Sequence, residues 1–192
     1  MRRGIVCGVV LVLSLSLLPA TGSAQDAGRL WSALAGGGHI ALMRHALAPG
    51  TGDPDDFRID DCATQRNLNG EGRAQARRIG EAFRRNGVDV DRVLSSQWCR
   101  CLETAELLTV GDVEAFPALN SFFRAREREA GQTGAVRDLL AELPLNGASL
   151  VMVTHQVNIT ALTGVFPRSG EIVVLKLDGA GGFEVAGRLQ PL

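Results

Sequence analysis

The chain has 192 residues, of which 45% are hydrophobic and 21% are charged, and its formal net charge at neutral pH is −1. This length suffices for one domain with a sizeable core, and the composition excludes a disordered or low-complexity protein. The near-neutral charge balance gives no extended basic surface for nucleic acid or for an anionic membrane.

The first 24 residues have the pattern of a secretory leader. Two early arginines precede an apolar run over residues 5–18, and small residues follow it. The run is short for a membrane-spanning helix, so we expect a signal peptide over residues 1–24, with a retained membrane anchor as the alternative. Cleavage before Gln25 would leave a periplasmic or secreted protein without stable membrane insertion. Its net charge would be −3, because 18 of the 20 basic residues and all 21 acidic residues remain.

Hydrophobic periodicity over residues 25–192 predicts alternating strands and helices in one domain. We expect helices over residues 29–35, 70–86, 100–108, 133–143 and 156–162, and strands over residues 39–43, 90–94, 113–116, 150–153, 172–177 and 183–189. The last two strands would form a hairpin, and residues 46–63 would form a long loop. This order predicts a three-layer α/β/α sandwich with a mostly parallel central sheet.

Three of the predicted parallel strands end next to residues that can bind an anion. Arg44 and His45 directly follow the first strand. Arg100 comes shortly after the second strand, and His155 follows the strand over residues 150–153. Ligands of such sheets bind beyond the carboxyl ends of the strands, so we expect the four side chains to converge there.

These four side chains have the properties of a phosphoryl-binding site. A guanidinium group grips phosphate oxygens with two parallel hydrogen bonds, and a free helix N-terminus offers further N–H groups. A neutral histidine nitrogen can attack phosphorus, and a second histidine, if cationic, can stabilise charge on the phosphoryl oxygens. Any one of these residues could be structural, so the hypothesis depends on their combination.

Four segments resemble signatures of the histidine phosphatase superfamily, which includes the phosphoglycerate mutases. Residues 44–46 (RHA) are similar to its arginine-histidine-glycine motif, and residues 68–76 (LNGEGRAQA) resemble its L-[TS]-x-x-G-x-x-Q-A segment. Residues 95–105 (SSQWCRCLETA) resemble its S-S-x-x-x-R-x-x-x-T-A segment, and residues 153–155 (VTH) resemble the strand with its second histidine. The resemblance spans about residues 38–177 in the family's order.

The resemblance implies a phosphomonoester phosphatase in which His45 becomes phosphorylated. Arg44, Arg100 and His155 would complete the phosphate pocket, and Thr51 is a candidate for a further phosphate contact. No metal and no organic cofactor would be needed. The substrate would be a small-molecule or glycan phosphomonoester, and exported lipopolysaccharide-core heptose phosphatases are one kind of relative with such a substrate.

The chain departs from the family pattern at the general acid. Many relatives have a glutamate after the third strand, where this chain has Asn120, and another branch has an aspartate where this chain has Gln156. Neither side chain can donate a carboxyl proton. Five candidate acids lie in the long loop, and two lie just before the helix predicted over residues 133–143. They are Asp53, Asp55, Asp56, Asp60, Asp61, Glu127 and Glu129. Ala46 is a further departure, because it replaces the usual glycine.

Two alternative functions stay open. The missing acid favours a non-catalytic phosphate- or phosphoglycan-binding protein, and the family also contains phosphomutases. A mutase is less favoured, because the family's mutases act in the cytosol and this chain carries an export pattern. Turnover of an aryl phosphate separates an enzyme from a binding protein, because its good leaving group needs little protonation.

Three cysteines remain after the leader. In an oxidising compartment we expect one disulfide and one free thiol, with three free thiols as the alternative. We favour a Cys62–Cys99 bridge, because Cys62 lies in the long loop and Cys99 flanks Arg100. Cys101 stands where relatives often have a small packed residue, so we expect it to be buried. A zinc site is disfavoured, because one residue separates Cys99 from Cys101 and no histidine lies nearby in the sequence.

Overall fold

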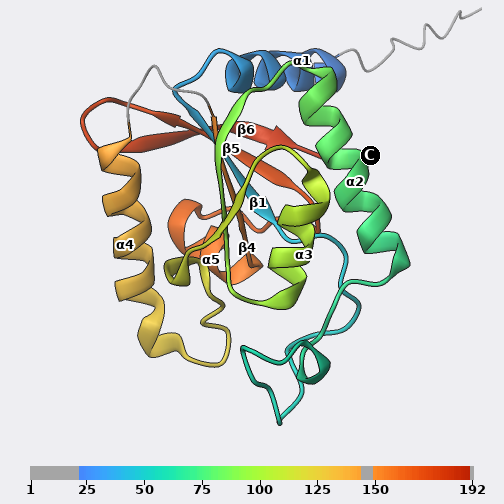
Figure 1. The fold of residues 1–192 in the computed structure, drawn as a ribbon. Coiled ribbons are helices and arrows are strands. Elements are labelled where there is room, and N and C mark those ends of the chain that lie inside the picture. Colours follow the sequence, from blue (N-terminus) through green and yellow to red (C-terminus); the bar gives the residue numbers. More distant parts are fainter. Residues whose placement is uncertain (1–21, 144–148, 191–192) are drawn as a thin grey trace, which may run out of the picture.

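A computed structural model describes residues 22–143 and 149–190, and these residues form a six-stranded sheet with helices on both faces (Figure 1). The strands are β1 (His39–Arg44), β2 (Val90–Ser95), β3 (Val113–Ala115), β4 (Ser149–Thr154), β5 (Ile172–Leu177) and β6 (Phe183–Leu189). The helices are α1 (Gly22–Ala35), α2 (Gly70–Arg85), α3 (Cys99–Leu108), α4 (Glu129–Glu142) and α5 (Gln156–Thr163). Across the described ranges, no helix is long and apolar enough to span a membrane.

The strand order is β3-β2-β4-β1-β5-β6, and the first four strands of this order run parallel. The hairpin β5–β6 continues the sheet with β5 antiparallel to β1. In the register Arg44 lies beside Thr154, and Ser95 lies beside Val153. The carboxyl ends of β1, β2 and β4 therefore meet at one edge, as the sequence predicts.

Both faces of the sheet are buried, which explains the continuous apolar run of β1. Ala41 and Met43 pack in a cluster with residues of α1, α2 and α3. Ile40 and Leu42 point to the opposite face, where they pack with residues of α4 and α5. Successive strand residues alternate between faces, so a strand covered on both sides needs apolar side chains throughout. The predicted α/β/α sandwich is confirmed.

Two helices begin earlier than the apolar pattern predicts. Helix α1 begins at Gly22 rather than at residue 29, because residues 25–29 are mostly exposed and residues 22–28 carry no apolar periodicity. Helix α4 begins at Glu129 rather than at residue 133, because its first turn contributes no buried side chain. The predicted cleavage position falls within α1, and residues 1–21 of the predicted leader lie outside the described residues.

Helix α2 approaches the chain after His45 so closely that a glycine is required. A Cβ added at Gly72 would lie 2.0 Å from the backbone oxygen of Leu47. The backbone N–H of Gly72 donates to the side chain of the N-cap Asn69 at 2.8 Å. The Gln75 side chain also accepts from the Leu47 N–H at 2.9 Å. The first turns of α2 thus hold the segment that follows His45.

We expect Gly72→Ala to lower the free energy of unfolding by about 1–3 kcal/mol, because overpacking against a fixed backbone forces the helix and the loop apart. Gly70→Ala is the matched control in the same turn, since no atom lies within 4 Å of its added Cβ. Urea denaturation of both variants measures the difference. Equal destabilisation of the two variants would contradict this account of the contact.

Candidate active site

The structure brings Arg44, His45, Arg100 and His155 together around one cavity of about 380 Å³. The cavity lies at the carboxyl edge of the sheet, where β1, β2 and β4 end. The two histidine rings are 5.5 Å apart between centroids and meet at an interplanar angle of 67°. Thr51, from the long loop, lines the same cavity and is exposed. All five residues singled out from the sequence therefore share one site.

His45 is buried, and its environment fixes both its charge and its tautomer. Burial lowers the pKa of His45 well below its ordinary value, and the nearby charge of Arg100 lowers this pKa further. Its Nδ1 lies 2.7 Å from the backbone oxygen of Ala46. A carbonyl only accepts, so Nδ1 carries the hydrogen and Nε2 keeps its lone pair. The neutral ring is therefore prepared to act as a nucleophile at Nε2.

His155 is also buried, but it has the opposite tautomer. Arg100 Nη2 lies 3.4 Å from His155 Nδ1, and a guanidinium only donates, so Nδ1 accepts. His155 Nε2 then carries the hydrogen and donates to Ser96 Oγ at 2.8 Å. Burial lowers the pKa of His155 well below its ordinary value, and the charge of Arg100 adds to this effect. In this environment the neutral ring is favoured, whereas the sequence analysis expected charge stabilisation from a cationic ring. A nearby phosphoryl dianion would raise the pKa of His155 again.

Arg100 is held by a buried ion pair with Asp53. Its Nη1 lies 2.6 Å from Asp53 Oδ1 and its Nη2 lies 3.2 Å from Oδ2, and the two side chains are 3% and 12% exposed. Trp98 Nε1 donates to Oδ2 at 3.0 Å, and the backbone N–H of Arg66 donates to Oδ1 at 3.1 Å. Burial opposes ionisation of Asp53, but these hydrogen bonds and the Arg100 charge outweigh it and lower the pKa of Asp53.

Arg66 is a cavity residue that the sequence analysis did not identify. Its Nε donates to the backbone oxygen of Gly52 at 2.7 Å, and its Nη1 donates to that of Ala48. Burial, followed by the charge of Arg100, lowers the pKa of Arg66 to about 10, so it stays cationic at neutral pH. The sequence around Arg66 does not distinguish it from a solvent-exposed arginine in a loop. Only the folded loop places Arg66 beside Arg44 and Arg100.

Arg44 completes the cationic lining. Its Nη1 donates to the backbone oxygen of Pro167 at 3.0 Å. Its Nε is buried and has no hydrogen-bond partner among the described residues, and the same holds for the Nε of Arg100. Three guanidinium groups and two neutral imidazoles thus surround one end of the cavity, an arrangement that suits a phosphoryl dianion.

The candidate acids separate into two groups. Asp53 and Asp55 line the cavity, and the Asp55 side chain is fully exposed at 3.4 Å from Arg124. The other candidates are absent from the cavity lining; they are Asp56, Asp60, Asp61, Glu127 and Glu129. Asp61 instead pairs with Arg58 and caps the 3₁₀ turn η1 (Cys62–Thr64).

Asn120, at the position of the expected acid, has a structural role. Its Oδ1 accepts from the backbone N–H of Gln97 at 2.8 Å and from Ser96 Oγ at 3.3 Å. Its Nδ2 donates to the Gln97 side chain at 2.8 Å. Asn120 therefore fixes the turn between β2 and α3, which also carries the hydrogen-bond partner of His155.

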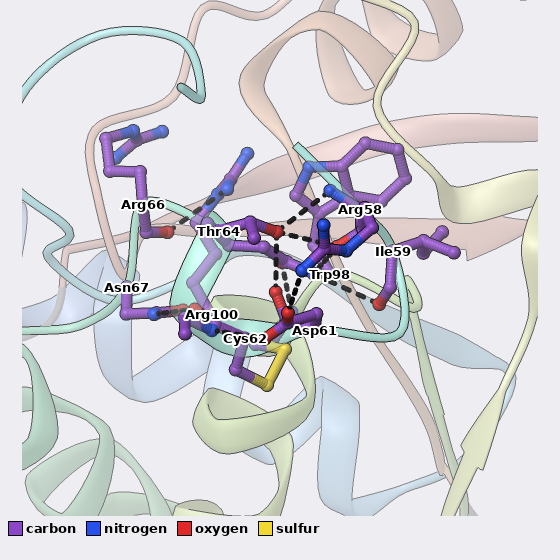
Figure 2. The surroundings of a disulfide bond; sticks show 12 residues. Arg58, Ile59, Asp61, Cys62, Thr64, Arg66, Asn67, Trp98 and Arg100 are labelled. Atoms are coloured by element: carbon purple, nitrogen blue, oxygen red, sulfur yellow. Dashed lines mark hydrogen bonds and ion pairs between the residues drawn. A yellow bond between two sulfur atoms is a disulfide. The ribbon is translucent and has the colours of Figure 1, made fainter. Parts of the chain in front are cut away.

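The predicted Cys62–Cys99 disulfide is present, and Cys101 is free and buried as predicted. Figure 2 shows the bridge beneath a network of loop residues that includes Arg58, Asp61 and Thr64. The bridge joins η1 to the first residue of α3, directly beside Arg100. The backbone N–H of Cys99 also donates to Gln65 Oε1 at 3.0 Å, so α3 and the loop are connected twice.

Cys101 lies against the second histidine rather than on the surface. Its Sγ is 3.5 Å from His155 Nε2. Burial raises the pKa of the Cys101 thiol to about 12, so the thiol stays protonated. Within residues 22–143 and 149–190, no group of three or more His, Cys, Asp or Glu side chains could hold a metal ion. That the protein needs no metal or cofactor stays a prediction.

Comparison with known families agrees with this geometry. The family model of the histidine phosphatase superfamily (branch 1) matches residues 40–131, which contain Arg44, His45 and Arg100. The resemblance to the histidine phosphatase superfamily is confirmed. His155 lies beyond the matched segment, and the register of β4 beside β1 places it. No curated protein sequence matches the chain.

Solved histidine phosphatase-like structures share the fold. The protein histidine phosphatase SixA complexed with tungstate has a TM-score of 0.59 at 21% identity, covering 80% of this chain and 97% of that chain. A putative phosphohistidine phosphatase SixA from Nakamurella multipartitia has a TM-score of 0.57 at 20% identity, covering 82% and 98%. A mycobacterial glucosyl-3-phosphoglycerate phosphatase has a TM-score of 0.51 at 17% identity, covering 71% and 92%. At these low sequence identities the comparison shows a shared fold and nothing about the reaction.

Proposed function

We propose that this chain is a phosphomonoester phosphatase that acts through a phosphohistidine on His45. The observation that carries the proposal is the state of His45. Its ring is buried and neutral, and Nδ1–H is fixed on the Ala46 carbonyl, so that the Nε2 lone pair is free. The guanidinium groups of Arg44, Arg66 and Arg100, at the same end of the cavity, suit the oxygens of the transferred group.

Hydrolysis proceeds in two steps. Nε2 of His45 attacks phosphorus, the N–P bond forms, and the ester P–O bond breaks as the leaving oxygen takes up a proton. Water then attacks the phosphohistidine and gives a proton to the carboxylate that served as the acid in the first step, the N–P bond breaks, and inorganic phosphate leaves. Arg44, Arg66 and Arg100 neutralise the phosphoryl oxygens in both steps, and His155, whose pKa the bound dianion raises, adds to this stabilisation when its ring is cationic.

Asp53 supplies the proton for the leaving group in this proposal. An arriving phosphoryl dianion competes with Asp53 for the guanidinium of Arg100. When Asp53 loses that cation and gains a neighbouring dianion, its pKa rises, because both changes disfavour the carboxylate. Substrate binding then converts an ionised Asp53 into a proton donor. Asp53 would thus take the role of the family's glutamate, whose position is occupied here by Asn120.

A phosphoramidate hydrolase, acting on phosphorylated histidine, is the second candidate. It is favoured by Asn120 and Gln156 at the two positions where an acid is expected, and by the ionised state of Asp53. A leaving nitrogen can carry its own proton, so such a substrate depends less on an enzyme acid. Two of the solved structures described above are named as histidine or phosphohistidine phosphatases. Turnover of phosphoramidate without turnover of any phosphomonoester would favour this candidate.

We propose that the protein works in the periplasm or outside the cell. The basic, apolar and small-residue order of residues 1–24 supports export. The Cys62–Cys99 bridge also fits an oxidising compartment, because structural disulfides rarely persist in a reducing cytosol.

The mechanism predicts that rapid quenching at neutral or basic pH, with labelled substrate, traps phosphate on His45 as an acid-labile adduct. His45→Ala should abolish both the label and turnover, because the covalent route then has no nucleophile. Arg66→Gln should lower kcat by about 10²–10³ without moving the label, since it removes one preorganised donor.

Near-normal turnover by His45→Ala would overturn the proposed chemistry, and phosphate binding without turnover by the unmodified protein would favour a binding protein. Label on a second substrate alcohol would favour a mutase.

For the acid, we compare Asp53→Asn with the exposed control Asp55→Asn. Asp53→Asn should reduce kcat/KM for an alkyl phosphate about 10²-fold more than for an aryl phosphate, because the poor leaving group needs the proton. Asp55→Asn should change both substrates equally. If Asp53→Asn lowers both rates by one common factor, Asp53 only positions Arg100, and the acid lies elsewhere.

For export, mass spectrometry of protein recovered from the periplasm should give an N-terminus near Gln25. Non-reducing digestion of the same sample should show one Cys62–Cys99 linkage and an unmodified Cys101. The bridge closes a loop of about 38 residues, so Cys62→Ser should cost roughly 3–4 kcal/mol of stability in the loop-entropy model. An intact Met1 on a cytosolic protein contradicts the export proposal.

A further inference from the structure

Glu171 is a buried carboxylate that the proposed mechanism does not use. It ends the connection between α5 and β5 (Figure 1), and its side chain is 0% exposed. Arg188 Nε, from β6, donates to Oε1, and the backbone N–H of Arg168 donates to Oε2 at 2.8 Å. Burial opposes ionisation, but the hydrogen bonds of Arg188, of the Arg168 backbone and of Gln190 outweigh it and lower the pKa of this carboxyl group. The group is therefore a buried anion at neutral pH.

One peptide group connects this anion to an arginine of the active site. The N–H of that peptide belongs to Arg168, and its carbonyl belongs to Pro167. The N–H donates to Glu171, while the Pro167 oxygen accepts from Arg44 Nη1 at 3.0 Å. The peptide is trans and planar, so its N–H and C=O point in opposite directions and neither can turn without the other. By fixing the N–H, the carboxylate therefore fixes the oxygen to which Arg44 donates.

The carboxylate also makes that oxygen a better acceptor. Hydrogen bonds in a chain polarise one another where the dielectric is low, and bonds to ionised partners are the strongest. Here the chain runs from a carboxylate through one peptide to a guanidinium. Within the described ranges Pro167 supplies the hydrogen bond that holds the Arg44 guanidinium, since the Nε of Arg44 is buried without a partner.

The backbone of the same connection is attached to the end of β1 independently of the Glu171 side chain. The N–H of Arg44 donates to the backbone oxygen of Glu171 at 3.1 Å. The N–H of Gly170 is shared between the backbone oxygens of Arg44 and His45, at 3.1 Å from each. Loss of the carboxylate would thus leave these contacts in place and release the direction of the Pro167 carbonyl.

We propose that Glu171 is a positioning residue of the phosphoryl site, which acts through the Pro167–Arg168 peptide on the guanidinium of Arg44. Its effect on turnover rests on the proposed phosphatase function, whereas the orientation of Arg44 is measurable without a substrate. The competing account is that Glu171 and Arg188 only stabilise the β5–β6 hairpin.

The first test is a double-mutant cycle. Glu171→Gln keeps the shape of the side chain, but one of its two polar atoms can no longer accept. It should lower kcat/KM for an aryl phosphate about 10–10²-fold, because a misplaced guanidinium loses contact with the phosphoryl oxygens. In an Arg44→Gln background the same substitution should change kcat/KM by no more than about twofold, since the residue through which it acts is gone. Glu184→Gln is the matched control, because it removes an ion pair with Lys176 from the same hairpin.

The second test needs no substrate. In ¹⁵N NMR spectra, a guanidinium whose rotation is restrained gives separate Nη1 and Nη2 signals, and a freely rotating one gives an averaged signal. The signals of Arg44 are identified by their loss in Arg44→Gln. They should be separate in the unmodified protein and in Glu184→Gln, and they should average in Glu171→Gln.

Each outcome decides the proposal. Unchanged kcat/KM in Glu171→Gln, an undiminished effect in the Arg44→Gln background, an equal loss in Glu184→Gln, or unaveraged Arg44 signals in Glu171→Gln overturns it. If the unmodified protein hydrolyses no phosphomonoester, the proposed function has failed, and the NMR comparison still decides whether Glu171 orients Arg44. If Glu171→Gln does not fold, Glu171→Asp takes its place with the same expected results. It keeps the charge opposite Arg188 but reaches one methylene less far toward the Arg168 N–H.

Discussion

The buried ion pair between Asp53 and Arg100 is the contact on which the site depends. A buried pair stabilises a structure only when its remaining donors and acceptors are also satisfied, because desolvation of both charges is costly. Here Trp98 and the backbone of Arg66 complete the hydrogen bonds of Asp53, while the Nε of Arg100 has no partner among the described residues. The pair therefore fixes the loop that follows β1 against the first turn of α3, and it orients the guanidinium beside His155. The Cys62–Cys99 bridge holds the same loop to the same turn covalently.

In the proposed mechanism, this arrangement prepares a phosphate site without leaving an unpaired buried cation. Arg100 is already balanced by a carboxylate, and a phosphoryl group can replace that carboxylate as its partner. One anion then exchanges for another, so the guanidinium is never left alone in a region of low dielectric. In that mechanism the same exchange links binding to protonation, because a displaced Asp53 would lose the interaction that keeps its pKa low.

Much of the fold was predictable because it follows from local patterns. The continuous apolar run before Arg44 predicts a strand buried on both faces, and the sheet order then brings His45 beside His155. The apolar pattern located α1 and α4 but missed their first turns. The charge states and tautomers of the histidines were not predictable, because Ser96 and Arg100 contact His155 only after folding. Arg66 and Arg124 lie in loops with no periodicity, so only long-range contacts assign them to the cavity.

The structure explains two departures from the family pattern, Ala46 and Asn120. Ala46 replaces a glycine without strain, because its φ angle is not positive and glycine's left-handed freedom is not used there. Its backbone N–H donates to Thr104 Oγ1 at 3.1 Å, and its carbonyl holds the ring of His45, so the backbone of this residue matters more than its side chain. Asn120 stands where many relatives have an acid, but its role is structural. Its side chain accepts a hydrogen bond from Ser96, and Ser96 in turn fixes the tautomer of His155. The proposed mechanism therefore takes its proton donor from another element, and Asp53 is the buried cavity carboxylate whose partner a bound phosphoryl group could replace.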